Sequence, residues 1–366
     1  MFKLNRRTFL AAGASAAAAT ALMGPRAFAQ TPVDFSGKTI EFWMPFAEGG
    51  GSDVWARFFA PFLSKHLPGQ PNVMIRNVPG GGSITGANEF VARARPDGLS
   101  LLGTSASTQF PFLLGDPRVR YDFAKLRPVL VSPTGGVVYL PARLGVSSPA
   151  ELGNIVDQEL VYGSQGATSL DLVPLLAFRL LGLNVRHVFG MTGRSDGRLA
   201  FERGEATIDY QTSSAYLTNV VPLVEQGDAV PMFSWGVLDA NGQVQRDPTF
   251  PDLPHFVEAY EMMHGTPPSG VEFNAYMAFF GSGFAAQKPA MLPERTSDDI
   301  VFTYRKAFED AVNDPELQAI KGDILGEYAQ AVGPDIDKLY EVATTVDPEA
   351  RDWVRTMLST DYQVQF

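Results

Sequence analysis

A strand-like segment that runs into three glycines and then into a helix-like segment constrains the fold of this chain most. The stretch MPFAEGGGSDVWARFFAPFL covers residues 44–63, and the apolar run TIEFWMPF precedes its glycines. The same order recurs in NVMIRNV, PGGGS and ITGANEFVARA, and LSLLGT then predicts a third strand. Strands that alternate with helices in this way are typical of a parallel sheet wound with helices, which binds ligands where its strands end.

A second block of the chain repeats this pattern. The segment QELVYGSQGATSLDLVPLLAFRLLG predicts a strand, a polar loop and a helix, VRHVFG a strand and GRLAFERGE a helix. ATIDYQTSSA predicts a strand that runs into hydroxyl-rich backbone. We interpret residues 236–270 as irregular, VEFNAYMAFFGSG as a strand and TSDDIVFTYRKAFEDAV as a capped helix. Because 366 residues exceed one small core, we expect an α/β protein of two domains.

Each glycine loop offers free backbone amides at the start of a helix. The first N–H groups of a helix lack intrahelical acceptors and lie at the positive end of its dipole. Glycines let an anion approach these groups without an intervening Cβ. We expect Ser52 or Asp53 to cap the first helix, and Ser83 and Thr85 to add donors to the second loop. A single glycine loop is more often a plain connection between a strand and a helix. Two such loops at the ends of consecutive strands favour a binding site for an anion.

Several other chemistries lack their sequence motifs. The patterns G-x-x-x-x-G-K-[ST], G-x-G-x-x-G, G-x-S-x-G and H-E-x-x-H are all absent. The four histidines lack the spacing of metal ligands, and there is no cysteine. We therefore expect no enzyme, no cofactor and no metal site. Without residues 1–29 the chain keeps 25 basic and 40 acidic side chains, a formal charge of −15, which argues against nucleic-acid binding.

Residues 1–29 are interpreted as an export signal. Arg6 and Arg7 precede Phe9 and Leu10 in the order of a twin-arginine motif, and an alanine-rich stretch follows, ending in a site for signal peptidase. Asn5 departs from that motif, so an ordinary secretory signal is the alternative. No later segment is an uncharged apolar run of membrane-spanning length. We expect a periplasmic protein without a lipid anchor, since there is no cysteine.

Four segments together resemble a known family. MPFAEGGGSDVWAR, VMIRNVPGGGSITGANEFVARARPDGLSLLGTSAS, YGSQGATSLDL and FPDLPHFVEAY are similar, in order and spacing, to substrate-binding proteins of tripartite tricarboxylate transporters, the TctC-like or Bug family. The resemblance implies a two-lobed, type II periplasmic-binding-protein (Venus-flytrap) fold that delivers a small organic anion, a di- or tricarboxylate or an aromatic acid, to membrane permease subunits. We expect a monomer, with lobe 1 at residues 31–134 plus 237–366 and lobe 2 at residues 135–236.

The resemblance also implies a binding site in which backbone amides of the two glycine loops hold a carboxylate. The implied ligand-binding residues are Phe46, Ala47, Gly50, Gly51, Ser52 and Asp53 in the first loop, Pro79, Gly80, Gly81, Gly82, Ser83 and Thr85 in the second, and Ser164, Thr168, Ser169 and Gln211 in lobe 2. Asp53 is expected to brace its loop.

This sequence departs from the family pattern at three positions. Asp171 stands where many members have His, Phe189 where many have Tyr, and Gln211 where many have Asp. Gln211 either lies near a second anionic group of the ligand or pairs with a neighbouring loop. The loop at residues 190–196 and the insert at residues 241–246 also look atypical. Two other functions stay open: a periplasmic sensor that signals to a receptor, and a secreted hydrolase.

Overall fold

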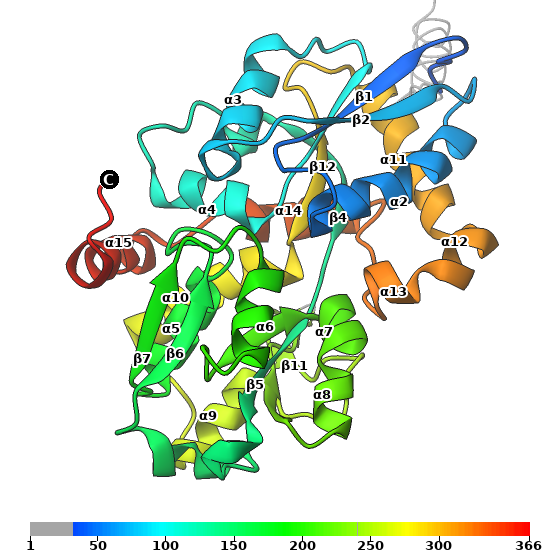
Figure 1. Cartoon of the computed structure of the whole chain (residues 1–366). Helices are drawn as coiled ribbons and strands as arrows, with labels where there is room; N and C mark the ends of the chain where they lie inside the picture. The colour runs from blue at the N-terminus through cyan, green and yellow to red at the C-terminus, as the bar shows by residue number, and fades with distance from the viewer. Residues whose placement is uncertain (1–31, 240) are drawn as a thin grey trace, which may run out of the picture.

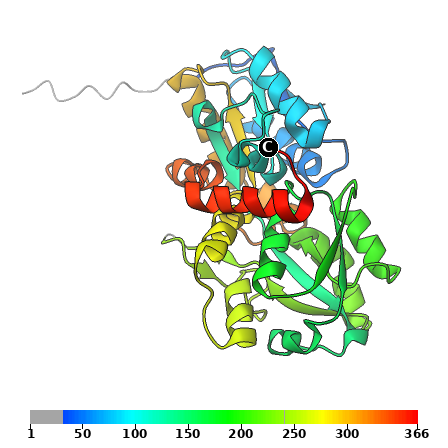
Figure 2. The ribbon, with the colours of Figure 1, turned by 90° about the vertical axis from the view of Figure 1, so that its left-hand side faces the viewer.

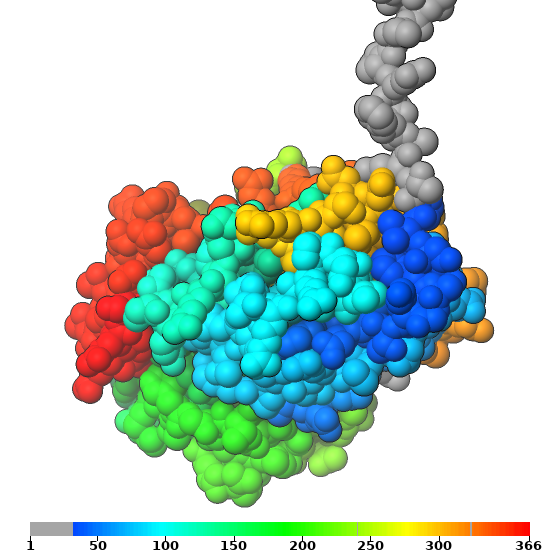
Figure 3. Space-filling view, turned by 90° about the horizontal axis from the view of Figure 1, so that it is seen from above, coloured from blue at the N-terminus to red at the C-terminus, as the bar shows by residue number. Residues whose placement is uncertain are grey.

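The chain forms two lobes, one above the other, in a computed structural model that describes residues 32–239 and 241–366 (Figure 1). The predicted export signal lies outside the described residues. Seen from above, the upper lobe covers most of the lower lobe (Figure 3). The glycine loops belong to the upper lobe.

A five-stranded sheet forms the centre of the upper lobe. Its strand order is β2-β1-β3-β12-β4, with bounds Asn72–Asn77, Thr39–Met44, Ser100–Gly103, Lys288–Leu292 and Arg127–Ser132. Strand β1 pairs in parallel with β2 and β3, as predicted, whereas β12 runs antiparallel to β3 and β4. The start of β12 therefore lies at the edge of the sheet where β1, β2 and β3 end.

Helices cover both faces of this sheet. On one face α2 (Gly51–His66) and α11 (Asp298–Val312) enclose a core that includes Phe42, Trp55 and Phe59. On the other face α3 (Ile84–Arg93) and α14 (Asp335–Thr344) enclose a core around Trp43 and Phe90. Strand alternation explains this division, because Phe42 and Trp43 are neighbours that point to opposite faces.

The lower lobe contains two smaller sheets. One has the order β8-β5-β9, with bounds Asp209–Thr212, Gly136–Pro141 and Ala229–Ser234, and the other pairs β6 (Leu160–Ser164) with β7 (Val185–Phe189) in parallel. Helices α5 (Leu172–Leu180), α6 (Arg194–Glu202), α7 (Ser213–Asn219) and α8 (Val221–Glu225) also belong to this lobe. The segment ATIDYQTSSA was predicted as a strand that runs into hydroxyl-rich backbone; the strand is β8, and the hydroxyl-rich end is the start of α7.

Two predictions of secondary structure are wrong. VEFNAYMAFFGSG was predicted as a strand but forms α10 (Val271–Phe280) and a π-helical turn, Gly281–Ala285. Helix α10 is apolar on most sides, so its sequence lacks the polar face that reveals a helical period. Residues 236–270, predicted to be irregular, contain the β10–β11 hairpin (Val237–Leu238 and Val244–Gln245) and α9 (Phe256–His264), which begins with a capping box of His255 and Glu258.

The C-terminal part of the chain does not stay in the upper lobe. Helices α9 and α10 pack into the core of the lower lobe, and α15 (Pro348–Tyr362) packs on α10 and lies across the junction of the lobes (Figure 2). The sequence-based boundary placed all of residues 237–366 in lobe 1. The remaining helices are α4 (Ala106–Leu114), α12 (Pro315–Ile320), α13 (Gly322–Leu325) and the 3-10 turns Gly81–Ser83, Phe123–Lys125, Ala142–Leu144 and Pro149–Ile155.

Candidate functional site: two glycine loops facing the lower lobe

The first glycine loop joins β1 to α2 and exposes its backbone. Residues 47–51 are exposed, and Phe46 and Ser52 are half-buried. The helix begins at Gly51 with Gly50 as its N-cap residue, so neither Ser52 nor Asp53 is the cap that we predicted. Since no side chain caps this end, the N–H groups of the first turn remain available to a ligand or to water.

Asp53 braces this loop from inside the protein. Its carboxylate is 1% exposed and accepts hydrogen bonds from the Gly49 N–H at 2.8 Å, from Arg57 Nε at 2.9 Å and from Asn77 Nδ2 at 2.9 Å. Burial acts to raise the pKa of Asp53, but these hydrogen bonds outweigh it and lower the pKa. Asp53 is therefore a charged support for the loop and is not available as a ligand contact.

The second glycine loop, between β2 and α3, has a left-handed backbone. Gly80, Gly81 and Gly82 have φ of 135°, 58° and 68°, and Ser83 follows with φ of 80°. L-residues rarely adopt these angles, so the three glycines are required by the path of the chain. Ser83 tolerates its conformation because its buried hydroxyl pairs with Thr108 Oγ1 at 2.8 Å. Residues 79–82 and Thr85 are exposed.

The two loops lie side by side. Asn77, the last residue of β2, donates to the Phe46 carbonyl at 3.0 Å as well as to Asp53. A Cβ on Gly86 would collide with the Val78 carbonyl and with Pro45, so this glycine lets α3 sit close to the ends of both strands. The exposed amides of both loops consequently share one edge of the upper sheet.

Helix α4 connects this edge to the lower lobe. Its residue Thr108 bonds Ser83 of the second loop, and Ser107 Oγ accepts from the N–H of Leu170 in the lower lobe at 3.4 Å. The predicted hydroxyl turn at residues 164–169 therefore lies beside α4. Sequence reasoning missed Ser107, although TSAS follows the third strand as the glycine loops follow the first two.

Asp171, two residues after that turn, accepts hydrogen bonds from its first two residues and from two tyrosines. Its Oδ2 accepts from Ser164 Oγ at 3.0 Å and from the Gln165 N–H at 2.6 Å, and its Oδ1 accepts from Tyr162 at 3.0 Å and Tyr210 at 3.2 Å. Ser164 and Asp171 are both fully buried. Ser164 was a predicted ligand contact, and the structure instead uses its hydroxyl to hold the turn.

A buried guanidinium lies next to Asp171. Arg194 forms ion pairs with Asp171, at 3.4 Å, and with Asp209, and it stacks over the rings of Tyr162 and Tyr210. Arg194 is the first residue of α6 and lies within residues 190–196, which looked atypical in the sequence. Two carboxylates thus share one cation, and burial raises the pKa of Asp209 while Arg194 opposes that rise.

Gln211 belongs to the same buried cluster. It is 1% exposed, and its amide donates to Asp209 Oδ2 and to the Arg194 carbonyl, each at 2.9 Å. This arrangement favours the second interpretation of Gln211, in which it pairs with a neighbouring loop.

Of the predicted lower-lobe contacts, Thr168 and Ser169 are half-buried, and Ser169 donates to the Gly166 carbonyl at 2.7 Å.

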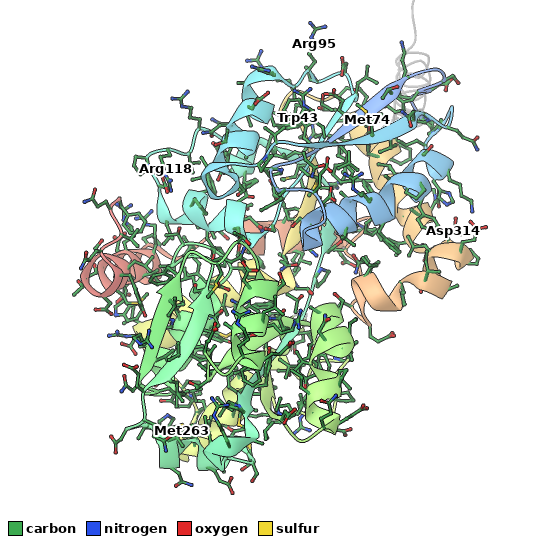
Figure 4. The ribbon with its side chains drawn as sticks, viewed as in Figure 1. Trp43, Met74, Arg95, Arg118, Met263 and Asp314 are labelled. Atoms are coloured by element: carbon green, nitrogen blue, oxygen red, sulfur yellow. The ribbon has the colours of Figure 1, made fainter. Side chains whose placement is uncertain are left out.

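A metal-binding group and a membrane-crossing helix are both absent from the residues that the structure describes. Among residues 32–239 and 241–366, no group of three His, Cys, Asp or Glu side chains could hold a metal ion. No helix there is both long and apolar enough to cross a membrane. A cavity of ≈ 440 Å³ bordered by Trp43, Met74 and Arg95 lies at the top of the upper lobe, away from the lower lobe (Figure 4).

The comparisons with known proteins concern the fold. No family model and no curated protein sequence matches the chain. Among solved structures, the periplasmic binding protein BugD has a TM-score of 0.62 and 19% identity, covering 88% of this chain and 98% of its own. This chain has the periplasmic-binding-protein fold.

Two further structures with this fold have names that mention a family or a ligand. A TctC solute-binding protein from Polaromonas has a TM-score of 0.63 and 16% identity over 88% of this chain and 98% of its own. MatC from Rhodopseudomonas palustris with bound malate has a TM-score of 0.61 and 20% identity over 87% of this chain and 100% of its own. The TctC and Bug proteins named in the sequence analysis are thus among the structural neighbours of this chain.

Proposed function

We propose that this chain is a periplasmic solute-binding protein that captures a small organic carboxylate for a tripartite tricarboxylate-type transporter. The observation that carries the proposal is the exposed backbone of two adjacent glycine loops, one of which is the uncapped start of a 16-residue helix. Neutral amides at a helix start hold an anion by hydrogen bonds and by the helix dipole. In this proposal the groups that contact the carboxylate are the N–H groups of residues 50–52 and 80–82 and the hydroxyl of Thr85.

The ligand is delivered by lobe movement in this proposal. The chain crosses between lobes near Thr134, between β4 and β5, and returns to the upper sheet between α10 and β12. In this proposal, closure brings the turn at residues 164–169 against the glycine loops. The partner is a membrane permease whose subunits receive the carboxylate from the closed protein. The malate in the neighbouring structure makes four-carbon dicarboxylates the first probes.

A calorimetric titration with malate, succinate, adipate, citrate and benzoate tests this function. We expect at least one carboxylate to bind, and Gly51→Leu to weaken its binding tenfold or more, because one lost charge-assisted hydrogen bond is worth about 1.5 to 3 kcal/mol. A Cβ on Gly51 meets no atom within 4 Å, so the variant should fold.

The matched control is Gly153→Leu. Gly153 is also exposed, and a Cβ there also meets no atom within 4 Å, but it lies in the 3-10 turn Pro149–Ile155 of the lower lobe. We expect this control to bind like the wild type. Equal affinity in Gly51→Leu and the wild type would contradict the assignment of the carboxylate to the first loop.

A further inference from the structure

Lys288 is the first residue of β12, and it lies at the same edge of the sheet as the glycine loops. In the strand order β2-β1-β3-β12-β4, β12 runs antiparallel to β3, so its first residue stands where β3 and β4 end. Lys288 pairs with Ser132, the last residue of β4. Two strand intervals separate β12 from β1, roughly 10 Å.

The face of the sheet on which Lys288 lies follows from strand alternation. Ala290 and Leu292, two and four residues further along β12, belong to the core that contains Trp55, whereas Met291 belongs to the opposite core. Lys288 therefore points to the face that α2 covers. Its partner Ser132 confirms this side, because Ser132 Oγ accepts from Trp55 Nε1 at 2.9 Å.

Trp55 links this position to the first glycine loop. It lies one turn beyond Gly51, where the free amides of α2 are. Lys288 and its partner Ser132 therefore lie on the face of the sheet against which Trp55 of α2 packs, at the edge where the glycine loops begin. A four-carbon stem that ends in three donors suits contact with an anion held at the first turn of α2.

Lys288 also lacks a counter-charge. The side chain is half-buried and forms no ion pair with the residues that the structure describes. Burial alone lowers the pKa of its ammonium group to about 8. In a chain with more acidic than basic residues, a half-buried cation without a carboxylate partner is unusual, because buried charges are normally paired.

Two neighbouring polar atoms at this edge have no partner either. Thr104, which follows β3, is fully buried, and its hydroxyl makes no hydrogen bond. Gln287, immediately before β12, is 4% exposed, and its side-chain carbonyl accepts none. By the strand alternation used above, however, Thr104 and Gln287 point to the face of the sheet opposite Lys288, so these unpartnered atoms belong to the same edge of the sheet but do not surround the lysine side chain.

We propose that Lys288 is a ligand-binding residue that contributes the positive charge to the carboxylate site. The inference rests on the proposed function and deepens it, since neutral amides would then hold one part of the anion and Lys288 would pair with a carboxylate from the side of β12. The proposal therefore limits the ligand to anions long enough to contact both α2 and β12, such as dicarboxylates.

The test compares Lys288→Met, Lys288→Arg and Lys38→Met with the wild type by calorimetry, using succinate and adipate as probes. Lys38 is exposed and directly precedes β1, at the opposite edge of the same sheet, so its variant removes the same charge far from the loops. We expect Lys288→Met to bind about 10- to 100-fold more weakly, Lys288→Arg to recover part of that loss, and Lys38→Met to bind normally.

Proton uptake gives a second readout that a structural role would not produce. At pH 8.5 a lysine with a pKa near 8 is partly neutral, and a bound carboxylate raises this pKa, so the wild type should take up protons on binding. Titrations in two buffers with different ionisation heats measure this uptake. Lys288→Met should show none, while the melting temperature of the free variant should not fall, since it loses an unpaired buried charge.

The possible failures can be told apart. If no carboxylate binds the wild type, the proposed function and this inference fall together. If succinate or adipate binds and Lys288→Met retains wild-type affinity and proton uptake, the function stands and Lys288 is only a desolvated strand residue.

Discussion

The side-chain amide of Asn77 donates to Asp53 Oδ1 at 2.9 Å and thereby ties the end of β2 to the residue that holds the first glycine loop. Asp53 in turn accepts from the Gly49 N–H at 2.8 Å. The two loops are therefore one unit, and a change in the support of one loop should disturb the other.

Asp53→Ala should lower both stability and affinity. The variant leaves the Gly49 N–H, Arg57 and Asn77 without their shared acceptor, and loss of a buried hydrogen-bonded charge costs about 2 to 4 kcal/mol. Urea denaturation measures the free energy of unfolding. Asp34→Ala, which removes an exposed carboxylate bonded to Ser36, is the control and should leave the stability near that of the wild type.

The pH dependence of Asp53 has a definite sign. Because its pKa is lowered from 3.8 in the folded protein, its stabilising effect is complete above pH 3.8 and is lost as the pH falls through the folded value. The stability difference between wild type and Asp53→Asn should therefore shrink below about pH 4. A difference that stays constant to lower pH would show that the carboxylate charge does not matter there.

Gln211→Asp should destabilise the lower lobe. The new carboxylate would adjoin Asp209 in a cluster where Asp171 and Asp209 already share Arg194, and an uncompensated buried charge costs about 3 to 5 kcal/mol. We expect a lower melting temperature at pH 7 and a partial recovery at pH 5, where protonation relieves the repulsion. If the variant has the melting temperature of the wild type but loses affinity for dicarboxylates only, Gln211 contacts the second anionic group of the ligand.

Arg194→Met should lower the stability of the protein about as much as Gln211→Asp does, and a second substitution should restore part of that stability. The variant leaves Asp171 and Asp209 buried without their cation, whereas Arg194→Met combined with Asp209→Asn removes one of those two charges. The double variant should therefore unfold at higher urea concentration than the single one. Arg203→Met, which breaks only an exposed pair with Glu205, should remain near the wild type.

Tyr328→Phe should shift the protein toward an open form. Tyr328 lies in the segment after α13, which is tied to the upper sheet by the pairing of Ala331 with Val131 of β4. Its phenol donates to Asp247 at 2.8 Å and shares a hydrogen bond with Ser213, the first residue of α7 in the lower lobe. Without this bridge, small-angle scattering of the free protein should give a larger radius of gyration, and ligand should restore the compact form. Tyr260→Phe, on α9, is the control. An unchanged profile would mean that the bridge does not hold the lobes together.

Local sequence patterns predicted much of the upper lobe correctly. The segments at β1, α2, β2, α3 and β3 match the structure within a few residues, because glycines, helix starts and strand alternation act over short distances along the chain. The two glycine loops could be recognised for the same reason. Helix α10 could not be recognised, because a buried apolar helix has the same composition as a buried strand.

The sequence by itself determined that two glycine loops follow consecutive strands, and residues other than glycine rarely adopt the positive φ angles of residues 80–82 in the second loop. The tertiary structure alone decided which side chains remain free for a ligand. It commits Asp53, Ser164 and Gln211 to internal hydrogen bonds, and it inserts β12 between β3 and β4 so that Lys288 reaches the same edge. Pairing of residues far apart in the chain depends on which surfaces are buried together, and no local pattern encodes that.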